Sequence, residues 1–540
     1  MKVSKELPLK SVDYKWDRMK RPHKKENLSK EKAVEFESKQ FEEYYVWLQE
    51  HMPESFFEEV DSQQYMLIAH YLMGFPLQDN FSQIQLKDVA FVLALDDPDV
   101  DIRILKNFNL NGIKNYQTFT SNVPPPFPGV KKKLKIAIIY FTSFTEELET
   151  QDVNKILPKK KQEELYAQLR EQDPTISKEE FEALLMRIGP TFVRSISSER
   201  LIIALRMFFR AKTRDNCQYE THFNENWKKQ KGNPPSLRIV FAWRNTPKYK
   251  FLFRMAKLIY RHNLKLVKVN SAYINPYSKN SILIMSLGLH GIKGKAAWEE
   301  ADIQDFLQEM VTLKYFPEGD LIENVFVEPG LLRGNTGNLL RTMASFVHQT
   351  LVHADINLYT FENIEEGLCR HPELTVQLCK AFELKFHPEK KDLEEYKREK
   401  EKFMILADHL DTGNELNDMR RKNILKQAMH FVDFTLKTNF YRNNKSALSF
   451  RLDPKYLNYV PYNRREKFPE LPYGIFFIKG MHFMAFHIRF KDLSRGGLRT
   501  VFPQRHEQMV SERNNVFSEC YNLAFTQQKK NKDIPEGGSK

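Results

Sequence analysis

The sequence predicts an α+β protein that is divided into several domains, on three observations. A chain of 540 residues is too long for a single hydrophobic core. Two segments, residues 88–142 and 236–316, alternate short apolar runs typical of strands with runs whose apolar residues recur at helical spacing. The stretches 150–215 and 331–445 carry helical spacing alone, and a content of 41% hydrophobic residues is enough for several cores.

Residues 1–32 form a basic tail. The whole chain has 83 Lys and Arg against 70 Asp and Glu, which gives a net charge of +13. The basic residues that crowd the tail are Lys2, Lys5, Lys10, Lys15, Arg18, Lys20, Arg21, Lys24 and Lys25. Such an arm can contact nucleic acid or an anionic membrane. The rest of the chain has no basic stripe interleaved with aromatic residues, so we expect a solvated tail and no nucleic-acid partner.

The sequence lacks the patterns that mark membrane, secreted and zinc-binding proteins. No apolar run approaches the roughly 18 residues of a membrane helix, and no apolar segment near the start marks a signal peptide, so no membrane partner is expected. The four cysteines are scattered, without a CxxC pair or a Cys/His cluster at zinc spacing. We therefore expect reduced thiols, no metal site and a cytoplasmic location.

Residues 33–149 are expected to form a helical hairpin followed by a ferredoxin-like module. Two amphipathic helices are predicted over 33–73, split near Pro53 and stopped by Gly74. The strand "DVAFVLAL", a helix, and the strands "NYQTFTS" and "LKIAIIYFT" follow in that order. This succession of strand, helix, strand and strand is most of a ferredoxin-like unit.

Two regions are predicted to be mainly helical. Residues 150–232 are rich in charge, and Ser177 with Glu180 forms a capping box ahead of an apolar run. Residues 331–440 carry apolar residues at helical spacing on either side of a charged helix. Three helical histidines have no carboxylate at ligand spacing, namely His348, His353 and His430. We expect these histidines to be packed or at the surface rather than bound to a metal.

Residues 233–330 contain the clearest module. The strand "SLRIVFAW" is followed by the helix "KYKFLFRMAKLIYRHN", by a hairpin of "KLVKVNSAYI" and "SILIMSLGLHG", and by the helix "AAWEEADIQDFLQEMVTLKYF". The run "IENVFVE" is expected to supply a last strand. This order looks like an ACT-type regulatory module, which in other proteins often binds an amino acid. A ferredoxin-like packing domain without a ligand is an equally open interpretation.

The last hundred residues, 441–540, combine strands with one long helix. "KSALSFRLDP" predicts a strand that is closed by its proline, and "YGIFFIKGMHFMAFHIRFKD" predicts two strands separated at Gly480. Both faces of the second strand are largely apolar, so it is expected to be buried on both sides. The run "RHEQMVSERNNVFSECYNLAFTQQKK" predicts the helix.

A glycine pair flanked by cations follows this strand, and another follows this helix. The motifs "RGGLR" and "PEGGSK" contribute Arg495, Gly496, Gly497, Arg499, Gly537, Gly538 and Lys540. Glycine admits the close approach of backbone to a ligand. If the helix folds back on the strand, the cations converge on a site for a small dianion, with one cation for each carboxylate. A lysine that is held among other cations and shielded from water has a lowered pKa and can act as a base.

The sequences of these segments resemble those of the large NAD-specific glutamate dehydrogenases. The resemblance is carried by "KSALSFRLDP", "FHIRFKDLSRGGLR" and "NLAFTQQKKNKDIPEGGSK", and it is dense over 440–540. It implies that residues 441–540 are the start of an α/β substrate domain. It also implies the oxidative deamination of L-glutamate to 2-oxoglutarate and ammonium, the cofactor NAD, and a homo-oligomer for the complete enzyme.

The resemblance also implies roles for individual residues. Arg495 stands where the small enzymes of this kind have a lysine that binds the side-chain carboxylate of the substrate, and arginine can grip a carboxylate bidentately. The helix lysine that binds the α-carboxylate falls on Lys530, with Lys529 as a near alternative. Lys540 is placed as the lysine that activates water for attack on the iminium intermediate. Gly496, Gly497, Gly537 and Gly538 are placed against the substrate.

The chain departs from the family pattern in one respect. In these enzymes a catalytic aspartate and a dinucleotide-binding domain come after the second glycine motif, but GxGxxG occurs nowhere in this sequence. We therefore expect the N-terminal part of a longer enzyme, without a complete Rossmann domain or an assignable NAD site, and inactive on its own. The alternative is a non-catalytic regulatory or interaction protein with an amino-acid-binding ACT-like domain.

Overall fold

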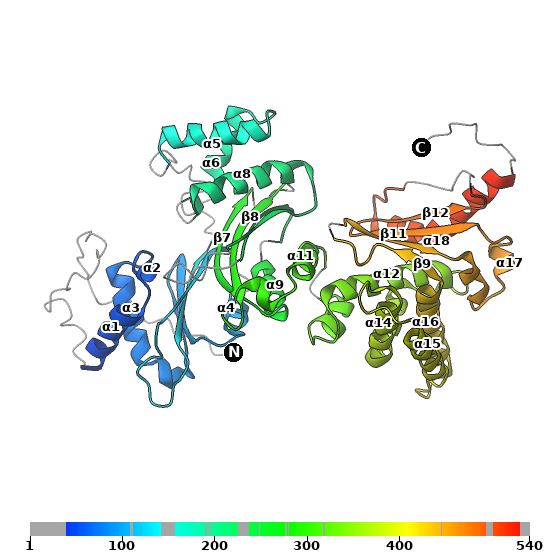
Figure 1. Cartoon of the computed structure of the whole chain (residues 1–540), viewed down its shortest axis with the longest axis horizontal. Helices are drawn as coiled ribbons and strands as arrows, with labels where there is room; N and C mark the ends of the chain where they lie inside the picture. The colour runs from blue at the N-terminus through cyan, green and yellow to red at the C-terminus, as the bar shows by residue number, and fades with distance from the viewer. Residues whose placement is uncertain are drawn as a thin grey trace. The chain divides into compact units, whose positions relative to one another are not determined.

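The computed structural model forms two compact units, unit 1 (Met1–Asp302) and unit 2 (Ile303–Lys540), which differ in their sheets (Figure 1). Residues are described over 39–108, 112–141, 157–188, 192–193, 196–224, 237–247, 249–275, 278, 280–316, 319–443, 445–492 and 501–529. Both units combine helices with an antiparallel sheet, so the predicted α+β fold of several parts is confirmed.

Unit 1 is built on one sheet of eight strands. The strands are β1 (Phe81–Gln85), β2 (Val89–Leu95), β3 (Ile113–Thr120), β4 (Leu134–Phe141), β5 (Gln218–Phe223), β6 (Leu237–Arg244), β7 (Leu264–Ile274) and β8 (Ile282–Gly291). They lie in the order β1-β2-β4-β3-β7-β8-β6-β5, and every neighbouring pair is antiparallel.

The sheet of unit 1 consists of two halves with the same connectivity. In the first half, β1 and β2 lead through helix α4 (Val100–Asn107) to β3 and β4; in the second, β5 and β6 lead through α9 (Phe251–Arg261) to β7 and β8. The strand orders 1-2-4-3 and 5-6-8-7 are equivalent, and the halves join where β3 pairs with β7, with Gln117 opposite Lys268. The two predicted modules therefore share one sheet, and each begins with an additional strand that the sequence analysis missed.

Helices cover both faces of this sheet. One face carries two separate groups of helices. The hydrophobic core of the first group includes residues of β2 and β4, and that of the second includes residues of β6, β7 and β8. The groups are α1 (Lys39–His51), α2 (Glu54–Phe57) and α3 (Ser62–Met73), then α5 (Lys159–Gln172), α6 (Lys178–Ile188) and α8 (Ser198–Thr213). The helices α4 and α9 contact each other on the opposite face. The remaining helical segments of unit 1 are η2 (Phe75–Gln78) and α10 (Ala297–Glu300).

A buried ion pair lies beneath α4. Lys135 Nζ lies 2.8 Å from Asp101 Oδ2, and the hydroxyl of Tyr116 donates to the other oxygen of the same carboxylate. All three side chains are buried, and burial raises the pKa of Tyr116 well above its usual value, with Asp101 adding to the rise. The Asp101 carboxylate thus accepts from both Lys135 and Tyr116, and its charge compensates the lysine that is removed from water.

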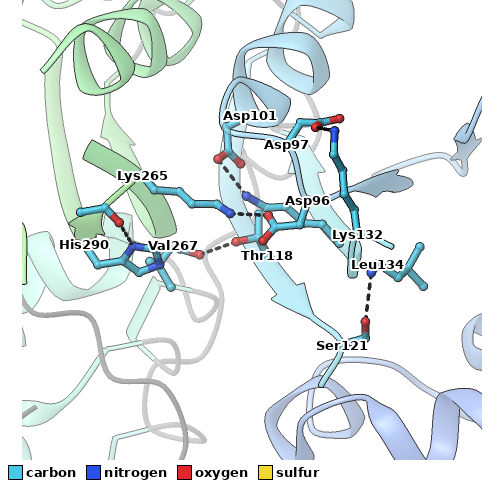
Figure 2. A network of polar contacts seen from close by, with 12 residues as sticks. Asp96, Asp97, Asp101, Thr118, Ser121, Lys132, Leu134, Lys265, Val267 and His290 are labelled. Carbon is cyan, nitrogen blue, oxygen red and sulfur yellow. Dashed lines mark hydrogen bonds and ion pairs between the residues drawn. The ribbon is translucent and has the colours of Figure 1, made fainter. Parts of the chain in front are cut away.

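The same network connects the two halves of the sheet (Figure 2). Lys265 of β7 forms an ion pair with Asp96, which follows β2, and the hydroxyl of Thr118 donates to the carbonyl of Val267 at 2.8 Å. Burial lowers the pKa of Lys265, and the neighbouring Lys135 adds to this effect. The junction of β3 and β7 is therefore held by side chains as well as by the backbone ladder.

Unit 2 packs helices against a sheet of four strands in the order β12-β11-β10-β9. Its strands are β9 (Thr435–Thr438), β10 (Ala447–Leu452), β11 (Gly474–Gly480) and β12 (Met484–Arg489). Its helices are α11 (Ile303–Met310), α12 (Gly334–Leu351), α13 (Phe361–Cys369), α14 (Pro372–Phe386), α15 (Leu393–Asp408), α16 (Glu415–Phe434), α17 (Arg464–Lys467) and α18 (His506–Lys529). Shorter helical segments are η5 (Leu313–Tyr315), η6 (Glu323–Val327) and η7 (Pro454–Tyr459).

Several local predictions are confirmed and three are wrong. The helix break near Pro53, the capping box of Ser177 and Glu180, and the strand break at Gly480 are all present. The run "IENVFVE" is a π-helical turn rather than a strand, and the helix predicted after β8 is two short helices, α10 and α11. The strand β12 is not buried on both sides: it lies at the sheet edge, and only its residues Phe486 and Ile488 are buried.

Candidate functional site

The candidate site lies where β12 and α18 lead into the two glycine motifs. The residues predicted for substrate binding and catalysis lie outside the described residues: Arg495, Gly496, Gly497, Lys530, Gly537, Gly538 and Lys540. The structure describes the chain as far as Asp492 before the first motif and as far as Lys529 before the second. It therefore shows how the two supporting elements are arranged.

Strand β12 and helix α18 lie side by side (Figure 1). Aromatic rings pack between them. The rings of Phe486 and Phe517 lie 5.2 Å apart. Further along both elements, the ring of Phe490 lies 5.3 Å from Tyr521 and 5.5 Å from Phe525. Later residues of the strand thus contact later residues of the helix, so the two elements run in the same direction. The strand and the helix consequently end on the same side of unit 2.

The end of α18 is fixed to the loop before β11 by Glu470. The hydroxyl of Tyr521 donates to the carbonyl oxygen of Glu470 at 2.7 Å. Lys529 Nζ lies 2.8 Å from the Glu470 carboxylate, which also accepts from Gln528 at 3.3 Å. The hydrogen bond from Lys529 lowers the pKa of Glu470. Lys529 is thus already paired with a carboxylate of the protein.

The middle of α18 is held by α12. The side-chain amide of Gln349 is fully buried; it donates to the carbonyl of Arg513 and accepts from the backbone N–H of Phe517 at 3.0 Å. A buried amide that bridges two helices fixes their register, because slippage would leave its polar atoms unpaired. The position at which α18 ends is therefore determined by contacts two turns and more upstream.

A charged cluster at the opposite end of the same strand pair was not singled out from the sequence. Lys479 pairs in register with Met484 at the hairpin, whereas Gly474 pairs with Arg489 at the other end. Burial raises the pKa of Glu365 to about 7, with the Asp320 carboxylate adding to the rise. Burial also lowers the pKa of Lys479. Perturbed groups of this kind gather at functional sites and in structural ion networks alike, and no spacing in the sequence connects them.

The three histidines expected on helices are packed, but His353 lies in the turn after α12 rather than in the helix. His348 is 1% exposed, and burial lowers the pKa of His348, His353 and His430 to about 4 each. Within the described part of the chain, no group of three or more His, Cys, Asp or Glu side chains is arranged to hold a metal ion. Likewise, no described helix is long and apolar enough to cross a membrane.

These histidines predict an acid-sensitive unit 2. Their folded-state pKa values lie below the ordinary value of 6.5, so the unfolded chain binds more protons between about pH 6.5 and pH 4. Their contribution to stability is complete above pH 6.5 and is lost as the pH falls through that window. Urea unfolding followed by circular dichroism at pH 7 and pH 5 measures the loss. His430→Phe is expected to reduce the loss, whereas a loss unchanged from that of an exposed-site control, His409→Gln, would contradict the assignment.

Comparisons with known proteins find similarity over part of the chain. A family model described as "Bacterial NAD-glutamate dehydrogenase, catalytic domain" matches residues 406–540. "Glutamate dehydrogenase 2" of Dictyostelium discoideum is 36% identical over 202 residues, which are 37% of this chain and 18% of that protein. "NAD-specific glutamate dehydrogenase" of Saccharomyces cerevisiae is 48% identical over 124 residues, 23% of this chain and 11% of the relative. The protein of the same name from Neurospora crassa is 44% identical over 130 residues, 24% of this chain and 11% of the relative. The chain thus spans less than a fifth of the length of these relatives.

Proposed function

We propose, from the confirmed resemblance of this chain to the large NAD-specific glutamate dehydrogenases, that it serves the oxidative deamination of L-glutamate to 2-oxoglutarate and ammonium. The observation that carries the proposal is the codirectional packing of β12 and α18, because each glycine motif follows one of these elements closely in the sequence. The match to residues 406–540 covers both elements and both motifs.

Two cations are proposed to grip the two carboxylates of the substrate. Arg495 would hold the side-chain carboxylate with paired N–H donors, a geometry that lysine cannot offer. Lys530 would hold the α-carboxylate from the end of α18. Backbone bared by glycine would let the substrate approach closely at Gly496, Gly497, Gly537 and Gly538.

The pairing of Lys529 supports Lys530 as the α-carboxylate ligand. Lys529 is bound to Glu470, and using it for the substrate would require breaking this ion pair. The contact is worth little as a stabilising interaction, since the Lys529 side chain is 59% exposed. It nevertheless already engages that ammonium with a carboxylate of the protein. Lys530 is the next residue along the chain.

Lys540 is proposed as the base that activates water for attack on the iminium intermediate. This role requires a neutral amine near pH 7, and nearby cations such as Arg495 would favour it by destabilising the ammonium form. NAD, when bound, would accept the hydride. No residue of this chain is assigned to its binding. We accordingly expect the 540-residue chain to bind the substrate without oxidising it. A cytoplasmic location and a homo-oligomeric enzyme are further parts of the proposal.

The duplicated sheet of unit 1 supports a second, regulatory role. Each half is a four-stranded antiparallel sheet with a helix, α4 or α9, across one face, which is compatible with the ACT-like arrangement expected from the sequence. In this proposal unit 1 binds an amino acid, whether or not unit 2 takes part in catalysis.

Adjacent lysines provide a matched test of the substrate site. Calorimetric titration of the whole chain with 2-oxoglutarate is expected to show affinity at least about tenfold weaker for Lys530→Met, because a charge-assisted hydrogen bond is lost. Lys529→Met, which removes an equal charge one residue away, is expected to change affinity by less than about threefold. Equal effects of the two substitutions, or a larger effect at Lys529, would contradict the assignment.

A further inference from the structure

A pocket of about 310 Å³ with several charged residues in its lining lies where the two halves of unit 1 meet. We call it the seam pocket, and its charged lining consists of Glu58, Glu59, Arg200, Arg238 and Lys268. It opens on the face of the sheet that bears α2 and α8, since residues of both helices line it. Tyr116 and Asp101 bond to each other on the opposite face, beneath α4. The pocket is therefore distinct from the buried network of Figure 2.

Three cations from three different elements converge on the seam pocket. Arg200 comes from α8, Arg238 from β6 and Lys268 from β7. Among the described residues none of the three forms an ion pair with a carboxylate, and Arg200 donates only to the hydroxyl of Ser197, at 3.2 Å. The protein thus gathers three half-buried cations without a direct ion pair, and carboxylates act on Arg200 and Lys268 only from a greater distance.

The energetic cost of this arrangement appears in the two most affected groups. Burial lowers the pKa of Arg200, and the nearby Arg238 lowers it further. Burial also lowers the pKa of Lys268, with Arg200 and Arg238 acting in the same direction. Like charges held together in a cavity destabilise the empty protein and favour an anion that relieves the repulsion.

The lining of the seam pocket also carries two carboxylates. Glu58 and Glu59 lie at the end of α2, and both act on Lys268 by raising its pKa against the effect of the other two cations. The sheet beneath contributes the buried polar side chains of Gln117, Asn270 and Ser286 to the lining. The pocket therefore offers a ligand cations, carboxylates and hydrogen-bonding groups.

The charges of the pocket specify a ligand that carries both signs. Three cations and two carboxylates sum to a net charge of +1. A ligand with two carboxylates and one ammonium has a net charge of −1, and each of its groups finds an opposite charge. A dicarboxylate without an amine would leave Glu58 and Glu59 opposed to it, and a monocarboxylic amino acid would leave a cation unpaired.

We propose that the seam pocket binds an acidic α-amino acid, with its carboxylates on Arg200, Arg238 and Lys268 and its ammonium on Glu58 and Glu59. The pocket spans both halves of the sheet, so an occupant would brace the junction of β3 and β7. Binding at this site does not depend on the chemistry proposed for unit 2. Only its interpretation as control by the substrate class rests on the proposed function.

Calorimetric titration of the whole chain with L-aspartate, L-glutamate, succinate and inorganic phosphate tests this assignment. At least one of the two amino acids is expected to bind about tenfold or more tightly than succinate, which has two carboxylates but no ammonium. Arg238→Gln is expected to weaken amino-acid binding at least about tenfold. Lys212→Gln removes a cation from the same helix as Arg200 but outside the pocket, and is expected to leave affinity within about twofold.

Glu59→Gln tests whether this carboxylate binds the ammonium group of the ligand. The variant is expected to reduce the preference for the amino acid over succinate. The proposal is overturned if neither amino acid binds at millimolar concentration, if succinate or phosphate binds equally well, or if Arg238→Gln has no effect. Repeating the titration in Lys530→Met separates the two sites. Binding at the seam pocket is expected to persist there, even if the proposed substrate site in unit 2 proves wrong.

Discussion

Replacing Asp101 with asparagine is expected to lower the free energy of unfolding of unit 1 by about 3–5 kcal/mol. The substitution keeps the shape of the side chain but removes the charge that compensates Lys135, whose side chain is 1% exposed. The lysine would then remain buried without a counterion, which is the costly case for an ion pair removed from water. All five tryptophans precede residue 303, so urea unfolding followed by tryptophan fluorescence measures unit 1 specifically.

A neighbouring ion pair supplies the control for this prediction. Asp97 pairs with Lys132, whose side chain is 58% exposed, so water can solvate the lysine when the partner is lost. Asp97→Asn is accordingly expected to cost less than about 1 kcal/mol. If the two substitutions cost the same, the buried pair does not support the fold as described.

The strands of unit 1 could be predicted from sequence only where they are apolar. Strands such as β2 and β4 read as continuous apolar runs because both of their faces are covered. The edge strands β1 and β5, "FSQIQ" and "QYETHF", have too little apolar character to stand out from loops. Without β1 and β5, the two halves of the sheet could not be recognised as equivalent from the sequence.

The joining of the two modules into one sheet could not be predicted. It depends on pairing between β3 and β7, whose partners Gln117 and Lys268 are separated by about half of the length of unit 1. No local pattern marks such a contact. The seam pocket was missed for the same reason, since its cations come from α8, β6 and β7 and share no spacing in the sequence.

In unit 2 the motifs could be found from sequence but their surroundings could not. The glycine pairs, the strand break at Gly480 and the long helix follow from residue type and periodicity. Phe483 and Phe486 look alike in the apolar run, yet Phe483 is exposed in the turn before β12, whereas Phe486 in the strand packs against Phe477 and Phe517. Likewise, only the folded chain brings Glu470 to Lys529 and so separates Lys529 from Lys530.

The second large effect is expected at Arg495. Its replacement by glutamine is expected to weaken binding of 2-oxoglutarate about 30-fold or more, because the carboxylate farthest from the keto group loses its charged partner. Binding of 2-oxopentanoate, which has a methyl group in place of that carboxylate, is expected to change little. The measurement is a calorimetric titration of the whole chain with each ligand, and Lys491→Gln serves as a control that removes a nearby cation.

The ratio of the affinities for 2-oxoglutarate and 2-oxopentanoate tests most directly whether a separate cation binds each of the two carboxylates of the substrate. The wild-type chain is predicted to prefer 2-oxoglutarate over 2-oxopentanoate by about 30-fold or more; Arg495→Gln should abolish this preference and Lys491→Gln should retain it. A preference that survives in Arg495→Gln, or that is missing from the wild-type chain, would contradict the site at the ends of β12 and α18.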